Sequence, residues 1–215
     1  MTTMQIDDKK YNVARIASIM NNITRYSTTP SLIKESVSDH SFLIGLLIID
    51  ASTEYPELFK YVKRENLLIR AVLHDMVETI TGDIPSPAKR AVPECETVFD
   101  KIESAVSDEL CKGRTDEFKD MLQSAISFSN PEDIEELLFK VFDYFCVLIK
   151  ASNEIYIGNK YYKRVVREMN VIMEDLSKVI SDRASRNKGF YELAVFYHTE
   201  VMTFLAELNR RVEKM

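Results

Sequence analysis

The chain has 215 residues, of which 46% are hydrophobic, and a formal net charge of -6. That length allows one domain, or one domain with an extension, and supplies enough apolar residues for a buried core. The acidic balance argues against a general binder of nucleic-acid backbones, which requires a basic surface. Because only 5 Gly and 6 Pro interrupt the chain, long helices are favoured over a fold of short strands and turns.

Cysteine spacing and the distribution of apolar residues indicate a cellular location. The cysteines Cys95, Cys111 and Cys146 are odd in number and lack CxxC spacing, which argues against a zinc knuckle or a redox pair. The segment from Met1 to Asp8 has no apolar core of the signal-peptide type. The longest apolar stretch, Phe42 to Ile49, is too short to span a membrane. We therefore predict a cytoplasmic protein with no membrane partner.

The first predicted helix runs from about Tyr11 to Ile23, with apolar residues at helical spacing. A polar loop follows Arg25-Tyr26. Ser38 is the predicted N-cap of the next helix, which places His40 in its first turn. After a break at a proline, apolar periodicity predicts one helix from about Arg64 to Thr79.

The middle of the chain contains clear helix boundaries. Residues Gly82 to Pro87 cannot be helical throughout, because a glycine and two prolines interrupt the hydrogen-bond ladder. Amphipathic patterns predict helices from Glu94 to Leu110 and from Asp116 to Ile126. Asn130-Pro131, followed by acidic residues, predicts the start of another helix, which Gly158 would end.

The C-terminal part continues the helical pattern. A stripe with a period of 3.6 residues extends from Tyr162 to Ile180, a turn follows at Asn187 to Gly189, and a final helix covers Leu193 to Leu208. No segment shows convincing strand alternation. We predict an all-α bundle of seven to nine helices. A single domain would cover residues 1–215, and residues 159–215 would pack on the core or form an oligomer interface.

Four residues beside apolar helical faces could bind a metal: His40, His74, Asp75 and Asp143. Two imidazoles and two carboxylates suit Mn, Fe, Co, Zn or Mg. Four protein ligands on an octahedral ion leave open positions, where a metal can activate water and polarise a phosphoryl oxygen. Two alternatives stay open. A buried histidine could simply be hydrogen-bonded, and Asp143 could pair with an Arg or a Lys.

The spacing of these four residues, H…HD…D, resembles that of the HD-domain metal-dependent phosphohydrolases. The similarity is greatest to the branch of bacterial 5'-deoxynucleotidases, and it covers roughly Ile16 to Glu154. It rests on Arg25-Tyr26, on Glu35 to Ser41, on the run from His74 to Lys89, and on Lys140 to Tyr144. Of these, the run from His74 to Lys89 is strongly specific.

The resemblance assigns roles to matching positions. Glu78 matches the catalytic carboxylate, and in the predicted helix it lies one turn after His74 on the same face. Arg25 matches the arginine that grips the phosphate, a role that suits a planar guanidinium. The alternatives are a surface salt bridge for Glu78 and a solvated side chain for Arg25. The metal ligands would be His40, His74, Asp75 and Asp143.

Three further residues would contact the substrate. Asp83 matches the acid that reads the deoxyribose, although it could instead cap the turn at Gly82. Tyr26 stands where relatives often have Trp, a residue that this chain lacks, and tyrosine can still stack on a base. Lys89 could assist with phosphate binding or be a solvated lysine.

Three functional hypotheses follow, all involving a divalent metal of unspecified identity. The first is hydrolysis of a deoxynucleoside monophosphate to deoxynucleoside and phosphate. The second is a deoxynucleoside triphosphate triphosphohydrolase, similar to small phage HD proteins that act on dATP, for which Lys34, Lys89 and Arg90 would supply positive charge. The third is a metal-binding HD regulatory module without turnover. The resemblance also implies a homodimer or higher homo-oligomer, with a small deoxynucleotide and no nucleic-acid polymer as its partner.

Overall fold

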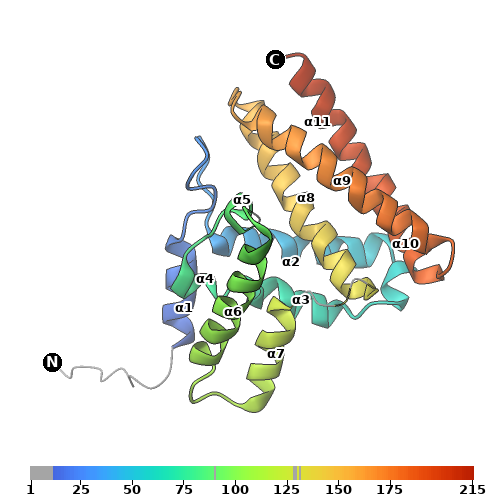
Figure 1. Cartoon of the computed structure of the whole chain (residues 1–215). Helices are drawn as coiled ribbons and strands as arrows, with labels where there is room; N and C mark the ends of the chain where they lie inside the picture. The colour runs from blue at the N-terminus through green and yellow to red at the C-terminus, as the bar shows by residue number, and fades with distance from the viewer. Residues whose placement is uncertain (1–11, 90, 128–129, 131) are drawn as a thin grey trace. The chain divides into compact units, whose positions relative to one another are not determined.

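The computed structural model describes residues 12–89, 91–127, 130 and 132–215, and this part of the chain is built from helices (Figure 1). Within it, the only strand-like pairing is an isolated antiparallel bridge between Thr24 and Ser36. If α10, η2 and α11 are counted as one continuous run, and the short elements η1, α4 and α5 are set aside, the described residues form eight helices. The prediction of an all-α fold with seven to nine helices is therefore confirmed.

The chain folds into two compact units. The first contains the described residues up to Thr28, residues Glu35–Ser41 and residues Ile69–Ser127, and the second contains the other described residues. Helices α2 and α3 contribute residues to both units. The bounds are α1 Val13–Asn22, α2 Val37–Glu54, η1 Leu58–Lys60, α3 Arg64–Leu73, α4 Glu78–Thr81, α5 Ser86–Lys89, α6 Pro93–Leu110, α7 Asp116–Ile126, α8 Ile134–Tyr156, α9 Tyr162–Ala184, α10 Lys188–Phe196, η2 Tyr197–Met202 and α11 Thr203–Glu213.

The core of the first unit holds the turn that carries His74-Asp75. Met76 and Val77, the next two residues, are buried in this core. Burial of two adjacent apolar side chains fixes the backbone of the turn, since moving either one would expose apolar surface to water. The buried members of this core are Ile16, Met20, Val37, Met76, Val77, Leu110, Cys111 and Leu122.

The second unit is organised around the long helices α8 and α9. The apolar face of α8 is fully buried at Leu138 and Phe142, and that of α9 is fully buried at Val166 and Met173. Tyr197, at the start of the π-helical segment η2, donates a 2.6 Å hydrogen bond to the Met173 carbonyl. The predicted stripe from Tyr162 to Ile180 is therefore helical. That residues 1–215 form a single domain, in which residues 159–215 pack on the core or form an oligomer interface, stays a prediction.

Two predicted helix starts are wrong. Ser36 caps α2, because its hydroxyl accepts the Asp39 N–H at 3.1 Å while the Asp39 carboxylate accepts the Ser36 N–H at 2.9 Å. This reciprocal pair is a capping box, which Ser38 cannot form. Helix α8 begins after Asp133, whose carboxylate accepts the Glu135 N–H at 2.7 Å, and not at Asn130. Pro131, and Tyr11 of the first predicted helix, lie outside the described residues.

The predicted continuous helix to Thr79 is also wrong. Helix α3 ends at Leu73, residues 74–77 form turns, and α4 begins at Glu78. Within the turns, Met76 N–H donates to the Leu73 carbonyl and Glu78 N–H donates to the Asp75 carbonyl, each at 3.0 Å. This tighter winding allows the consecutive residues Met76, Val77 and Glu78 all to be buried. Neighbouring residues of a regular α-helix point in directions about 100° apart, so they rarely share one face.

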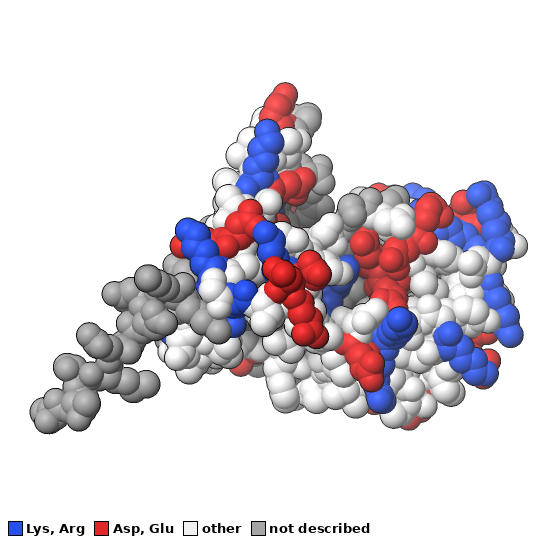
Figure 2. Space-filling model, turned by 90° about the horizontal axis from the view of Figure 1, so that it is seen from below, with Lys and Arg blue, Asp and Glu red and all other residues white. Residues whose placement is uncertain are grey.

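The surface carries charged side chains of both signs. On the face shown in Figure 2, acidic and basic side chains of the described residues are interspersed. None of the described helices has both the length and the apolar composition that crossing a membrane requires. The three cysteines are free thiols.

Candidate metal centre

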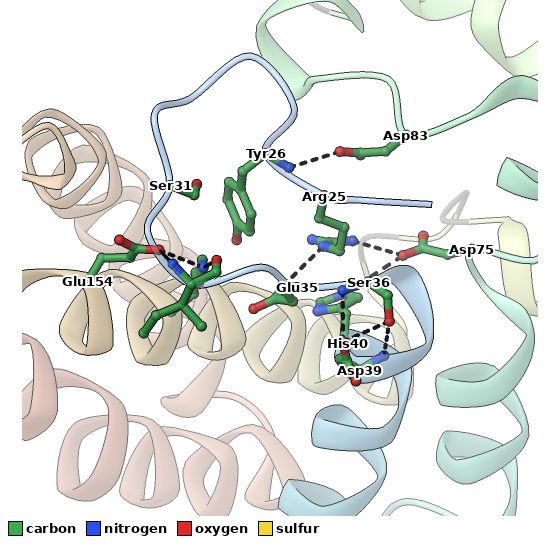
Figure 3. Close-up of polar contacts among 12 residues, drawn as sticks. Arg25, Tyr26, Ser31, Glu35, Ser36, Asp39, His40, Asp75, Asp83 and Glu154 are labelled. Atoms are coloured by element: carbon green, nitrogen blue, oxygen red, sulfur yellow. Dashed lines mark hydrogen bonds and ion pairs between the residues drawn. The ribbon is translucent and has the colours of Figure 1, made fainter. Parts of the chain in front are cut away.

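His40, His74 and Asp75 converge on one point in the first unit. His40 lies in the first turn of α2, and the other two lie in the turn after α3. The Asp75 Oδ2 atom is 3.1 Å from Nε2 of His74 and 3.8 Å from Nε2 of His40. One potential ligand atom from each residue lies within 4.8 Å of the others. His40 and Asp75 are shown in Figure 3. Such convergence of two imidazoles and a carboxylate is typical of a metal site.

The orientation of His74 fits this interpretation. Its Nδ1 atom is 3.2 Å from the Ala71 carbonyl oxygen. Since a carbonyl can only accept, Nδ1 carries a proton, which leaves Nε2, the nitrogen that faces Asp75, as the one that can bind a metal once it is deprotonated. A backbone carbonyl that fixes the tautomer in this way is a common support for metal-binding histidines. His40 is only 1% exposed, so its ring is also held by its surroundings.

Electrostatics keeps Asp75 ionised. Burial raises the pKa of its carboxyl group, but the positive charges of His74, Arg25 and His40 outweigh burial. Together with the hydrogen bond from His74, they hold the pKa of Asp75 well below its usual range. Asp75 therefore presents a carboxylate, the form that binds a cation.

Arg25 lies beside this cluster. Its Nη1 atom donates to Asp75 Oδ2 at 3.0 Å, and its Nε atom is 3.4 Å from a carboxylate oxygen of Glu35 (Figure 3). The backbone supports this placement, because the Arg25 N–H donates to the Glu35 carbonyl at 2.9 Å next to the bridge between Thr24 and Ser36. No role was predicted for Glu35 from the sequence, although this residue lies within a matching motif.

Asp83 and Tyr26, the residues predicted to contact the sugar and the base, are joined by a hydrogen bond to the Tyr26 backbone. Tyr26 has a left-handed conformation with a φ of 58°, and its N–H donates to Asp83 Oδ2 at 3.1 Å (Figure 3). The guanidinium carbon of Arg25 lies 5.7 Å from the centroid of the Tyr26 ring. The structure thus brings Arg25, Tyr26 and Asp83 together. The contact between Asp83 and the Tyr26 amide was not foreseen from the sequence.

Glu78 is buried at the start of α4. Its side chain is 7% exposed, and its Oε2 atom has no hydrogen-bond partner among the described residues. Burial, with a contribution from the negative charge of Asp75, raises the pKa of Glu78 to about 9. A surface salt bridge, the alternative interpretation of this residue, is excluded by its burial.

Lys89, at the end of α5, has a partner that the sequence did not reveal. Its Nζ atom is 2.7 Å from a carboxylate oxygen of Glu103 on α6. Burial lowers the pKa of Lys89, but the hydrogen bond and charge of Glu103 outweigh burial and raise it, with smaller contributions from Glu78 and Asp75. Lys89 is therefore a half-buried, paired cation, and not a freely solvated one.

Asp143, the fourth predicted ligand, lies on α8 in the second unit and is half-buried. It remains a predicted ligand. Of the two other cations considered for a triphosphate, Lys34 is exposed in the second unit, and Arg90 lies outside the described residues.

Solved structures define the class of fold. An HD-domain phosphohydrolase from Listeria innocua aligns with a TM-score of 0.71 and 18% identity, over 94% of this chain and 91% of that chain. The HD phosphohydrolase DatZ of cyanophage S-2L, solved with bound dA and one catalytic Zn2+ ion, aligns with a TM-score of 0.56 and 16% identity. The alignment covers 96% of this chain and 99% of that chain. The fold is that of the HD-domain phosphohydrolases.

Sequence relatives narrow this class. The family described as 5'-deoxynucleotidase YfbR-like matches residues 12–184, and the chain belongs to this family of HD-domain phosphohydrolases. The 5'-deoxynucleotidase VV1113 of Vibrio vulnificus is 24% identical over 157 residues, which cover 73% of this chain and 81% of the relative. The 5'-deoxynucleotidase YfbR of Salmonella arizonae is 24% identical over 175 residues, which cover 81% of this chain and 84% of that relative. The predicted resemblance is confirmed.

Proposed function

We propose that the protein hydrolyses the 5'-phosphate of 2'-deoxynucleoside monophosphates, giving deoxynucleoside and phosphate. The observation that carries this proposal is the convergence of His40, His74 and Asp75 within 4.8 Å, in a member of the YfbR-like family. The relatives named above are 5'-deoxynucleotidases, which supports the choice of substrate.

The donor set fits a divalent metal such as Co, Mn, Zn, Fe or Mg. His40, His74 and Asp75 would hold it, with Asp143 as the proposed fourth ligand. The two imidazoles, once each has a deprotonated Nε2, and the ionised carboxylate would satisfy the requirement that ligands be deprotonated. When bound, a divalent ion supplies Lewis acidity, which polarises a phosphoryl oxygen and acidifies water.

Residues of the chain would perform the remaining steps. Arg25 would bind the phosphate, since its planar guanidinium can donate two parallel hydrogen bonds to phosphate oxygens. Glu78 would exchange a proton with the attacking water or the leaving oxygen, because none of the described residues hydrogen-bonds to its Oε2 atom. Asp83 would accept the 3'-hydroxyl, and the ring of Tyr26 would stack on the base.

The pairing of Lys89 favours a monophosphate over a triphosphate. A triphosphate carries more negative charge and requires more positive charge near the metal. Glu78 and Asp75 act electrostatically on Lys89, but Glu103 already neutralises this lysine at 2.7 Å. The charge balance of the described site therefore suits a substrate with fewer phosphates.

The products of three substrates test the proposal. Purified, metal-loaded protein would be incubated with dAMP, AMP and dATP, and the released anions identified. We expect phosphate from dAMP and less phosphate from AMP. Release of triphosphate from dATP as the main reaction would replace the proposal with a triphosphohydrolase. No product from any substrate would favour a regulatory module without turnover.

A variant tests the role of Glu78. Glu78→Gln keeps the shape of the side chain but cannot transfer a proton, so we expect turnover of dAMP to fall about 10²–10⁴-fold. Metal content, measured on the same preparation, should stay unchanged. Glu109→Gln, at an exposed position on α6, is the matched control and should behave as the unmodified protein. Retained activity in Glu78→Gln would show that this role is wrong.

The homodimer or higher oligomer implied by the resemblance stays a proposal. Size-exclusion chromatography with light scattering measures it directly, since one chain has a mass of 24.9 kDa. A mass near that of one chain at micromolar concentration would contradict it.

A further inference from the structure

Tyr26 has a conformation that its side chain does not favour. Its φ of 58° lies in the left-handed region, and it is the only non-glycine residue with a positive φ among the described residues. Such backbone strain in a bulky residue persists only where the surrounding structure holds it. The contacts that hold Tyr26 therefore set the path of the chain directly after Arg25.

Within the described residues, the segment before this turn pairs through its backbone with residues 35–37. The Val37 N–H donates to the Ile23 carbonyl at 3.1 Å, and the Arg25 N–H donates to the Glu35 carbonyl at 2.9 Å. In the described part of the chain, this backbone pairing reaches no further than Arg25. The next N–H along the chain, that of Tyr26, donates instead to the Asp83 carboxylate at 3.1 Å. The Asp83 side chain thus holds the backbone at Tyr26, directly after the last backbone hydrogen bond of the pairing.

Asp83 is itself held in place. It directly follows Gly82, whose φ of 72° ends α4, and α4 begins at the buried Glu78. The carboxylate therefore extends from a short segment anchored in the core of the first unit. Its second oxygen is a separate acceptor, so one side chain can serve the Tyr26 amide and a ligand hydroxyl together.

We propose that Asp83 is a positioning residue for Arg25. By accepting the Tyr26 N–H, it maintains the left-handed turn and so keeps the Arg25 guanidinium beside Asp75. This inference rests on the proposed function, in which Arg25 binds the phosphate. It adds that the residue assigned to the sugar also determines how the phosphate is bound.

A substrate without a 3'-hydroxyl separates the two roles. For an Asp83 that only reads the sugar, Asp83→Ala should leave kcat/KM for 2',3'-dideoxyAMP unchanged. For a positioning residue, Asp83→Ala should lower kcat/KM about 10-fold or more for both dAMP and 2',3'-dideoxyAMP. Asp83→Asn keeps an acceptor oxygen, so it should recover most of the activity on the dideoxy substrate. Equal activity of Asp83→Ala and unmodified protein on that substrate would overturn the proposal.

A second measurement does not depend on turnover. In the metal-free protein, we expect Asp83→Ala to speed hydrogen exchange at the Tyr26 amide and to shift the NMR signal of the Arg25 Nε–H. Asp83→Asn should shift both less. Asp100→Ala, at an exposed position on α6, is the control for surface substitution and should change neither. Unchanged Tyr26 exchange and an unchanged Arg25 signal in Asp83→Ala would also overturn the proposal.

These measurements distinguish two kinds of failure. If the unmodified protein hydrolyses no nucleotide, the proposed function fails, and the Tyr26 and Arg25 signals alone decide the positioning role. If it hydrolyses dAMP but Asp83→Ala affects only substrates with a 3'-hydroxyl, the proposed function stands and the positioning role fails. Should Asp83→Ala not fold, Asp83→Leu, which also lacks an acceptor, replaces it in both measurements.

Discussion

Two polar clusters in this protein, one partly buried and one buried, use similar residues in opposite ways. The first, the histidine–aspartate cluster, consists of His40, His74 and Asp75. The second, the lysine–glutamate cluster, consists of Lys150, Glu154 and Asn159, which are 3%, 0% and 5% exposed. Both contain charged residues removed from water, which is costly unless hydrogen bonds and opposite charges compensate.

The lysine–glutamate cluster is complete without a ligand. The Glu154 carboxylate accepts from Lys150 at 2.8 Å and from Asn159 at 2.7 Å, and it also accepts the backbone N–H groups of Leu32 and Ile33 at 3.0 and 2.9 Å. Glu154 is labelled in Figure 3. Each strong acceptor position is occupied, which is typical of a structural network.

The histidine–aspartate cluster is arranged differently. Three cationic or potentially cationic groups, on His40, His74 and Arg25, all approach the single oxygen Oδ2 of Asp75. Nearby, Glu78 buries an oxygen that has no hydrogen-bond partner in the described part of the chain. Several donors share one acceptor, and beside them a buried carboxyl oxygen has no hydrogen-bond partner among the described residues; this pattern indicates a site arranged for a ligand. The comparison shows that the pattern of partners, more than burial itself, separates function from structure.

Asp75→Asn should produce the largest effect. The loss of a negative ligand should remove most of the bound metal and lower turnover at least about 10³-fold, since several kcal/mol of charge stabilisation disappear. Metal content and thermal unfolding measure this. Metal at about 100 times Kd should stabilise the unmodified protein by about 2.7 kcal/mol and should not stabilise the variant. If Asp75→Asn kept its full metal content, the histidine–aspartate cluster would not be the metal-binding site that distinguishes it from the lysine–glutamate cluster.

Glu154→Ala should be the most destabilising change in the lysine–glutamate cluster. It leaves Lys150 buried without its counter-ion, so we expect a loss of about 3–5 kcal/mol in the free energy of unfolding by urea. Arg164 and Glu168 form an exposed pair with the same spacing at 2.7 Å, so Glu168→Ala is the matched control. Glu168→Ala should lower the free energy of unfolding by about 0.5 kcal/mol or less. Equal costs would show that the buried network is not structural.

The lysine–glutamate cluster should also control acid stability. Burial raises the pKa of Glu154, but its hydrogen bonds from Lys150, Asn159 and the two backbone amides lower it to about 2. A carboxyl whose pKa is lower in the folded state stabilises the protein above its unfolded pKa. This contribution should be lost as the pH falls from about 5 to about 2. Urea unfolding of the unmodified protein and of Glu154→Gln across this range would reveal a flatter profile in the variant.

Glu103→Gln should have the smallest effect of these variants. It frees Lys89 from its partner, which adds positive charge near Glu78 and favours longer phosphate chains. Because partly exposed pairs contribute about 1 kcal/mol or less, the ratio of kcat/KM for dATP to that for dAMP should rise about 5-fold at most. Glu109→Gln, whose partner Lys112 is exposed, should leave the ratio unchanged. A fall in the ratio would contradict this role of Lys89.

Local signals predicted much of the fold. The amphipathic pattern predicted α7 at its observed bounds, Asp116–Ile126, and α6 to within one residue of its start at Pro93. The break after Leu73 was not predicted, because the apolar pattern continues through it. That break depends on burying Met76 and Val77 together, and burial depends on which other helices complete the core.

The site was predicted in its residue types but not in its contacts. The pattern H…HD…D led to His40, His74 and Asp75, which the structure brings together. The partners Glu35 and Glu103 were missed, because a chain with 34 acidic residues offers many possible ion pairs. Only spatial proximity, which sequence spacing does not reveal for non-local pairs, selects among them.

The sequence by itself determined the helical class, the family and the residues capable of binding a metal. Helix periodicity and short motifs are local, so one chain is enough to read them. The tertiary structure decided that two imidazoles share the Asp75 oxygen, that Glu78 is buried, and that Asp83 holds the strained turn at Tyr26. These features depend on desolvation and on contacts between distant segments, and only the folded chain establishes both.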